Sequence, residues 1–220
     1  MTFKTLHIFQ GVLSMSADTP QRALKAKLRE VRATLIMDAA EEVFIEKGYH
    51  DASMDEIAAR AGIAKGTLYQ HFPGKEELVF ALFERSLALF EHAVDQAVAA
   101  DLTARAKLER ILHYVYLDLR GVRTLLHLLS QNVDLHMSLG KKKGQLRDRL
   151  EKCKEQLRMI IEEGKAKGIF DPTLSTGLML SAFMSALMFN RQERLTAGEQ
   201  LSAEELVTQI GHILFEGFCR

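Results

Sequence analysis

The sequence is poor in proline, cysteine and tryptophan. It contains 3 prolines, 2 cysteines and no tryptophan among its 220 residues. The two cysteines, Cys153 and Cys219, lack the close spacing of a zinc or dithiol motif. We expect both to be reduced thiols in a cytoplasmic protein that holds no metal and no cofactor, with a thiol sensor as the alternative.

Long apolar runs are also missing. No run reaches the roughly 18 residues that a membrane-spanning helix needs. The apolar stretch 6–12 is too short and lacks the layout of a signal peptide. A glycine-rich phosphate loop, a nucleophile motif and a paired-histidine zinc motif are absent from the sequence as well. These absences favour a protein that is neither an enzyme nor a membrane protein.

What the sequence does contain is apolar residues at helical spacing, which predicts an all-α fold. The formal net charge is zero, so a nucleic-acid partner would have to meet locally concentrated positive charge. Such a concentration occurs in residues 21–32. This stretch is either the solvated start of a helix or an arm that lies along DNA phosphates or in the minor groove. Its basic residues are Arg22, Lys25, Lys27, Arg29 and Arg32, against the single acid Glu30.

The stretch SMDEIAARAGIAKGTLYQHF predicts two short helices joined by a tight turn. Ser53 is a good N-cap for the first helix, with Glu56 three residues later completing a capping box. Gly62 follows where a residue with positive φ would end that helix. On the second helix we expect Leu68 and Phe72 to face inward. The pattern indicates a helix-turn-helix, although any helical hairpin remains an alternative on pattern alone.

The outer face of the second helix carries few charges. It presents hydroxyls, an amide, an imidazole, one ammonium group and a glycine that allows a backbone to come close. Groups of this kind donate to phosphates and read base edges in duplex DNA. The residues expected to face out are Lys65, Gly66, Thr67, Tyr69, Gln70 and His71.

The segment AGIAKGTLYQHFPGKEELV, preceded by AAEEVFIEKGYHDASMDEIA, resembles the N-terminal domain of TetR/AcrR-type bacterial transcription regulators. The resemblance extends from about Arg32 to Leu82. It implies a ligand-responsive repressor that binds a palindromic operator in double-stranded DNA as a homodimer. The matching residues are Ala39, Phe44, Gly48, Tyr49, Ile57, Ala58, Gly62, Thr67, Leu68, Tyr69, Phe72 and Lys75.

The expected DNA-contacting set combines this resemblance with the helix-turn-helix pattern. Lys75 opens a long helix, whose amides and dipole already favour an anion at that end. By resemblance, Thr67, Tyr69 and His71 hold the DNA backbone, whereas Lys65, Gly66 and Gln70 lie nearer to base edges. The full set is Arg32, Ser53, Lys65, Gly66, Thr67, Tyr69, Gln70, His71 and Lys75.

The rest of the chain predicts further helices. In the first, at 34–47, the apolar stripe comprises Leu35, Ala39, Ala40, Val43 and Phe44, and Gly48 ends it. The later helices are expected at 75–100, 103–119, 145–167, 173–194 and 203–218. Asp171 and Pro172 are expected to start the helix at 173–194. We expect three regions: a flexible basic leader at 1–28, the helix-turn-helix domain at 29–75, and an effector-binding and dimerisation domain at 76–220.

The last two helices are expected to form the homodimer. Gly177, Ser181 and Ser185 recur every fourth residue and leave a smooth strip for close helix approach. Two such helices from each subunit would make a four-helix interface. Packing within one subunit alone is the alternative.

A small, mostly apolar or acyl-type effector is expected among the middle helices, where it would favour a spacing of the DNA-binding domains that no longer fits the groove. The basic stretch 141–154 is a solvated face or a dock for acyl-CoA phosphates. Rival hypotheses are a DNA-bound interaction protein whose C-terminal domain docks another protein, and a helical enzyme or carrier. The candidate effector residues are Phe90, His113, Leu117, His127, Met159 and Phe183.

Overall fold

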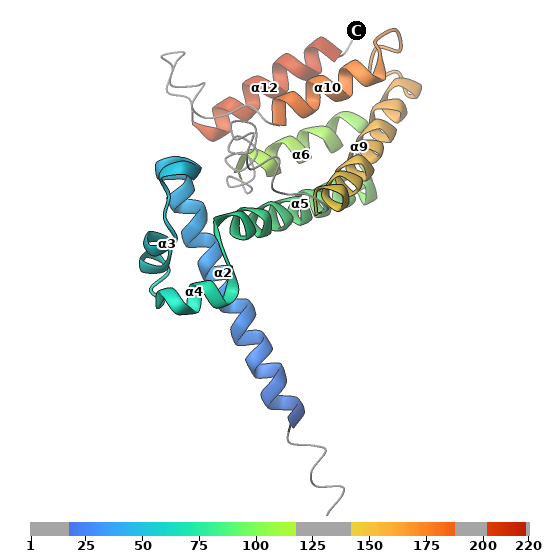
Figure 1. The fold of residues 1–220 in the computed structure, drawn as a ribbon. Helices are drawn as coiled ribbons and strands as arrows, with labels where there is room; N and C mark the ends of the chain where they lie inside the picture. The colour runs from blue at the N-terminus through green and yellow to red at the C-terminus, as the bar shows by residue number, and fades with distance from the viewer. Residues whose placement is uncertain (1–17, 118–141, 188–201, 219–220) are drawn as a thin grey trace, which may run out of the picture. The chain divides into compact units, whose positions relative to one another are not determined.

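A computed structural model of the chain describes residues 18–117, 142–187 and 202–218. All regular structure in these ranges is helical, which confirms the all-α prediction. The chain divides into two compact units, residues 1–74 and residues 75–220, which we describe one at a time. Figure 1 shows the helices of both units.

The first unit contains three described helices, α2 (Asp18–Asp51), α3 (Met54–Arg60) and α4 (Lys65–His71). Gly48 breaks the helical geometry inside α2, with φ 78° and ψ 177°. Glycine adopts this conformation without the steric cost that other residues meet. The sequence was therefore right that Gly48 ends the regular helix, although a further turn follows it.

We expected a flexible leader at residues 1–28, but residues 18–28 are helical and belong to α2. This stretch is rich in Ala, Leu, Lys and Arg, which are strong helix formers. The basic residues counted above therefore lie on a helix that continues without a break into the core of the unit.

The core of the first unit forms where α2 packs against α3, and α3 against α4. Ile36, Ala40 and Val43 of α2 are fully buried. The prediction that Leu35 faces inward was wrong: it is 51% exposed, because the adjacent residue Ile36 occupies the core position. The exposed apolar stripe of α2 consists of Leu24, Leu28, Val31 and Leu35.

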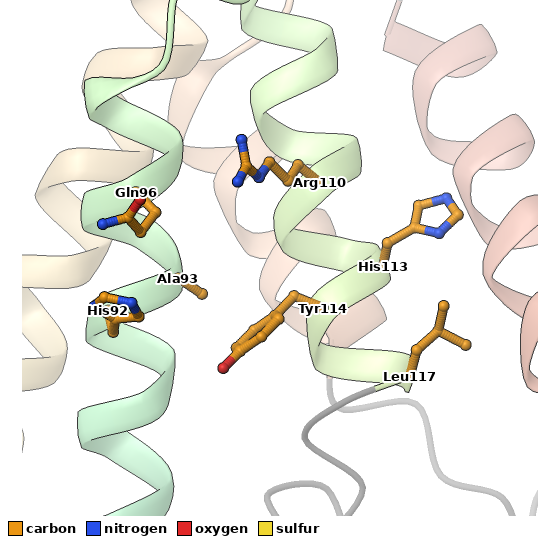
Figure 2. A pocket seen from close by; sticks show the side chains of 7 residues that line it. All are labelled: His92, Ala93, Gln96, Arg110, His113, Tyr114 and Leu117. Carbon is orange, nitrogen blue, oxygen red and sulfur yellow. The ribbon is translucent and has the colours of Figure 1, made fainter.

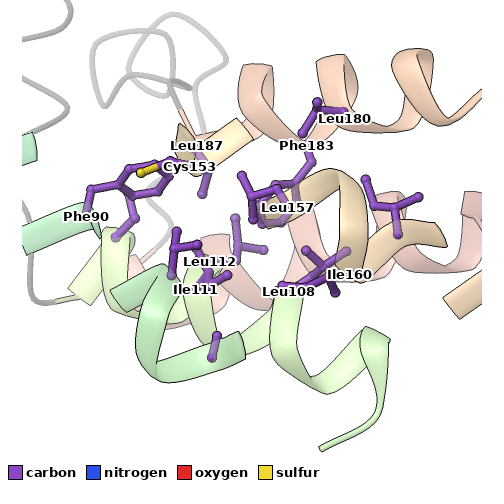
Figure 3. Packing of buried hydrophobic residues seen from close by; sticks show 14 of the residues in the cluster. Phe90, Leu108, Ile111, Leu112, Cys153, Leu157, Ile160, Leu180, Phe183 and Leu187 are labelled. Atoms are coloured by element: carbon purple, nitrogen blue, oxygen red, sulfur yellow. The ribbon is translucent and has the colours of Figure 1, made fainter. Parts of the chain in front are cut away.

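The second unit is built from five described helices. They are α5 (Lys75–Ala99), α6 (Ala104–Leu117), α9 (Lys142–Ala166), α10 (Thr176–Leu187) and α12 (Ala203–Phe218). Helix α6 packs against α5, α9 and α12, and all five helices contribute to one apolar core. Figure 3 shows part of that core around Leu157 and Phe183, which are fully buried. Among the described residues, no helix is both long and apolar enough to cross a membrane.

Ion pairs fasten α9 to its neighbours. Arg149 on α9 donates two hydrogen bonds to the carboxylate of Glu91 on α5, one of them at 2.8 Å. The largely buried ammonium group of Lys107 on α6 lies 3.1 Å from an oxygen of Glu163 on α9. A nearly buried charge needs a partner of this kind, because burial without one is costly.

Cys153 of α9 lies within the core. Burial is the main reason that the pKa of its thiol is raised to about 11, and the carboxylates of Glu91 and Asp95 raise it further. The thiol is therefore protonated at neutral pH and weakly nucleophilic. This disfavours the thiol-sensor alternative for Cys153, while Cys219 lies outside the described residues.

Helix α10 begins later than expected. Asp171 and Pro172 precede a turn in which the Asp171 carboxylate accepts hydrogen bonds from the Thr173 amide at 2.8 Å and the Thr173 hydroxyl at 2.7 Å. This local bonding competes with a helix start, and α10 begins at Thr176. One face of α10 is open in the single chain, where Leu178 is 67% exposed. Helix α10 is therefore not buried on all sides in one chain.

Candidate nucleic-acid interface and effector hollow

The turn between α3 and α4 is fixed by local chemistry. The Ser53 hydroxyl caps α3 by accepting a hydrogen bond from the Glu56 amide at 3.2 Å. The Glu56 carboxylate itself lies 2.6 Å from the Lys47 ammonium group of α2. Gly62 then adopts a φ of +65°, which ends α3 and turns the chain toward α4. The predicted Ser53 cap and the predicted glycine turn are confirmed, whereas the return bond from Glu56 that would complete the capping box stays a prediction.

Helix α4 has a buried side and an open side. Leu68 is fully buried and Phe72 nearly so, as predicted. The predicted outward residues differ in how open they are. Thr67 and His71 are half-buried. Lys65, Gly66, Tyr69 and Gln70 are exposed. These six residues thus lie on one short helix, which packs against α3.

An acidic neighbour holds the one lysine on this face. The ammonium group of Lys65 lies 2.7 Å from a carboxylate oxygen of Asp55 in the first turn of α3. The hydrogen bond from Lys65 to Asp55 raises the pKa of the lysine, and the charge of Asp55 adds to the effect. Lys65 therefore stays cationic, but its charge is partly neutralised by the Asp55 carboxylate.

The end of α4 lies near two arginines of α2. The pKa of His71 is lowered, mainly by burial and further by the charges of Arg29 and Arg32. These electrostatic effects place both guanidinium groups on the same side of the unit as α4. The structure therefore brings the predicted residue Arg32 together with the α4 set, and adds Arg29 to it.

Ser53 and Lys75 complete the predicted DNA-contacting set. Ser53 is exposed, but its hydroxyl already serves as the cap of α3. Lys75 begins α5 and belongs to the second unit. Their roles at DNA stay predictions.

The second unit has an open hollow of about 420 Å³ between α5 and α6. In Figure 2, His92 and Gln96 extend from α5, and Arg110 and Tyr114 from α6. An adjoining hollow of about 310 Å³ lies between α6 and α12, and His113 lines both. The larger hollow offers a guanidinium, two imidazoles, an amide and a phenol, which suits a polar or anionic ligand group.

The candidate effector residues are separated by the structure. His113 and Leu117 line the larger hollow. Phe90 and Phe183 are buried in the core of the unit. Met159 is 63% exposed on α9, so it lies outside the core and does not line this hollow. His127 lies outside the described residues.

Comparison with known proteins agrees with the α3–turn–α4 geometry. Residues 36–82 match the family described as bacterial regulatory proteins, tetR family. Residues 36–82 therefore form a DNA-binding domain of the tetR type. Over 101 residues it is 39% identical to the HTH-type transcriptional activator FasR of Mycolicibacterium smegmatis, covering 44% of this chain and 46% of FasR. Over 109 residues it is 32% identical to the fatty acid metabolism regulator protein of Bacillus subtilis, covering 47% of this chain and 56% of that protein.

The chain thus spans about half the length of these two curated relatives. The fold of this chain is similar over a longer stretch to that of a solved structure, the transcriptional regulator FadR from Bacillus subtilis in complex with stearoyl-CoA. The TM-score is 0.64 at 24% identity, and the match covers 84% of this chain and 98% of FadR. The likeness supports the helical fold of the second unit as well as the first.

The sequence-based candidate sets left out several residues that line these open sites, and Arg29 was named only as part of the basic stretch 21–32. Arg29 lies three residues before Arg32, a spacing that puts both on one helix face. His92 and Gln96 share a face of α5 for the same reason. No local signal says which faces of α5 and α6 border one hollow, because that depends on how the two helices pack.

Proposed function

We propose that the chain is a DNA-binding transcription regulator that acts in the cytoplasm as a homodimer on a palindromic operator. The open face of α4 carries this proposal. It holds hydrogen-bonding side chains and one lysine on a helix whose opposite side is anchored by Leu68. A face of this composition suits the major groove, where side chains read base edges and grip the adjacent phosphates.

Within this proposal, Thr67, Tyr69 and His71 hold the DNA backbone. Gln70 and Lys65 reach base edges, and Gly66 allows close approach. Two copies of α4 related by two-fold symmetry would contact half-sites about one turn, or roughly 34–36 Å, apart.

The open faces of α10 and α12 support the homodimer. Leu178 on α10 is 67% exposed and Ile213 on α12 is 72% exposed in one chain. Side chains this apolar and this open are typical of surfaces that a partner covers. Gly177 is half-buried and Ser181 exposed on the same helix, so small residues would let a second copy approach closely.

We further propose that the regulator is a repressor released by an acyl-type effector, an apolar chain with an anionic or polar end group. The names of two similar proteins, the fatty acid metabolism regulator and FadR with stearoyl-CoA, support this class. Arg110 and His113 would meet the polar end in the hollow of Figure 2. Because FasR is named an activator, repression is the finer part of the proposal.

The pairing of Lys65 with Asp55 allows a test with two changes of opposite sign. Lys65→Gln should weaken duplex binding roughly tenfold, because a charge-assisted contact to a base edge is lost. Asp55→Asn should strengthen binding several-fold at low salt, because it removes the competing carboxylate beside Lys65. Fluorescence anisotropy of a labelled duplex measures both. A fall in affinity for Asp55→Asn, with its helical content unchanged, would contradict this placement of the DNA surface.

The effector proposal predicts that stearoyl-CoA releases the labelled operator duplex and that CoA alone does not. Arg110→Gln should raise the concentration needed for half-release roughly tenfold, because a charge-assisted hydrogen bond is worth about 1.5–3 kcal/mol. Arg158→Gln is the matched control, since Arg158 is an exposed arginine of α9 that does not line the hollow. Equal increases in the stearoyl-CoA concentration for half-release in both variants would contradict the placement of the effector's polar end group at Arg110.

A further inference from the structure

The first four turns of α2 carry a row of positive charge on one side. Arg22, Lys25, Arg29 and Arg32 follow one another at spacings of three, four and three residues. Residues at these spacings share one face of a helix. All four are exposed. We call this row the basic face.

The direction of the basic face follows from the rest of the same helix. Continuing from Arg29 and Arg32 at helical spacing leads to Ile36, Ala40 and Val43, which are fully buried in the core of the unit. Helix α2 packs against α3 there. The lowered pKa of His71, to which the charges of Arg29 and Arg32 contribute, independently places these two residues near α4. In Figure 1 the first turns of α2 extend well past α4.

We propose that the basic face is a second duplex-binding element, which runs along phosphates of the same DNA that α4 grips. The inference rests on the proposed function and extends it to residues 22–29, beyond the helix-turn-helix. From Arg22 to Arg32 the helix rises about 15 Å, at roughly 1.5 Å per residue. This length matches about four nucleotides of one strand, at a rise of roughly 3.4 Å each.

The chemistry of the basic face predicts what it contributes. Lysine and arginine on phosphates release counterions, so they add affinity that falls steeply with salt. Contacts to phosphates carry no direct sequence information. The basic face therefore strengthens binding to every duplex alike, and α4 keeps the choice of sequence. A neutral chain needs such a local concentration of charge if it is to hold DNA at physiological salt.

The test compares the variant Arg22→Gln/Lys25→Gln/Arg29→Gln with Lys27→Gln in the full chain. Glutamine has nearly the helix propensity of lysine and arginine, so α2 is retained, which circular dichroism checks. Lys27 lies on the opposite side of the same helix, about 160° from Arg29, and serves as the charge control. Anisotropy is recorded with the operator and with an unrelated duplex between 50 and 200 mM salt.

The triple variant should lower the salt slope of the homodimer by about 5.4, or roughly 0.9 for each of the six contacts that its two copies lose. Between 50 and 200 mM salt the wild-type affinity should therefore fall roughly 10³-fold more than that of the variant. Its preference for the operator over the unrelated duplex should stay unchanged. Lys27→Gln should match the wild type.

Two further measurements locate the contact. Ethylation of individual DNA phosphates should identify a set of phosphates at which the modification lowers the duplex affinity of the wild type but not that of the triple variant. The pKa of His71, followed by NMR, should rise in the single variant Arg29→Gln, because one of the charges that lowers it is gone. A rise seen only with Lys27→Gln would contradict the orientation of α2.

The inference is overturned if the triple variant keeps the wild-type salt slope. It is also overturned if Lys27→Gln lowers the salt slope by as much as each substitution of the triple variant does. Either result would leave the helix-turn-helix proposal standing, because the wild type would still select its operator. Failure of the proposed function looks different, since the wild type would then bind no duplex in preference to another.

Discussion

Replacing Leu178 and Ile213 together with aspartate is expected to separate the homodimer into single chains and to weaken operator binding by roughly 100-fold or more. Both side chains are more than half exposed in one chain, so the change should spare its fold. In the dimer, each new carboxylate would be buried in an apolar interface without a partner, at a cost of several kcal/mol. A single chain then loses the roughly 10²–10⁴-fold gain of binding two half-sites together.

Sedimentation velocity measures the separation, and anisotropy measures the loss of binding. Leu89→Asp provides the control, because Leu89 is an exposed leucine of α5, at 39%, outside the proposed interface. That variant should remain dimeric and bind DNA as the wild type does. A dimer that survives both aspartates would refute the interface on α10 and α12.

The second large effect concerns Gly164, where α9 passes close to two other elements. A Cβ atom at this position would lie 2.3 Å from the ring of Phe170 and 2.9 Å from the side chain of Ala104. The ring cannot withdraw easily, because the Gly164 carbonyl accepts hydrogen bonds from the amides of Ile169, at 2.8 Å, and Phe170, at 3.2 Å. Gly164→Ala should therefore destabilise the second unit by about 2 kcal/mol, since the overpacking cost exceeds the gain in helix propensity.

Differential scanning calorimetry should show this as a fall of roughly 4–8 °C in Tm for a unit of this size. Gly144→Ala on the same helix is the matched comparison, because nothing lies within 4 Å of a Cβ there. It should leave Tm unchanged or raise it slightly, since alanine is the better helix former. Equal changes in Tm for the two variants would show that the contact between position 164 and Phe170 does not cause the loss of stability.

The helix-turn-helix was predictable because its signals are local. Ser53 caps the helix that it precedes, and Gly62 supplies a positive φ that few other residues tolerate. The inward side of α4 follows from the spacing of Leu68 and Phe72 alone. These features depend on neighbours within a few residues, so the sequence displays them directly.

Other features depended on packing between distant segments. Leu35 and Ile36 are both apolar and adjacent, and only contact with α3 decides which one is buried. The hollow between α5 and α6 combines His92 with Arg110, residues whose helices are joined by a turn but whose facing sides the sequence does not mark. The start of α10 was misplaced because Asp171 bonds to Thr173 instead of capping a helix.

Selection of duplexes from a random-sequence library by the purified wild-type chain tests the central claim most directly. That claim is that the open face of α4 reads a major groove twice in one symmetric complex. The account predicts enrichment of one two-fold symmetric sequence with half-site centres about 10–10.5 base pairs apart, or a multiple of that spacing. Gln70→Ala should relax the preference at one position of each half-site. A chain that enriches no sequence, or whose enriched sequence is unaffected by changes on α4, would contradict the account.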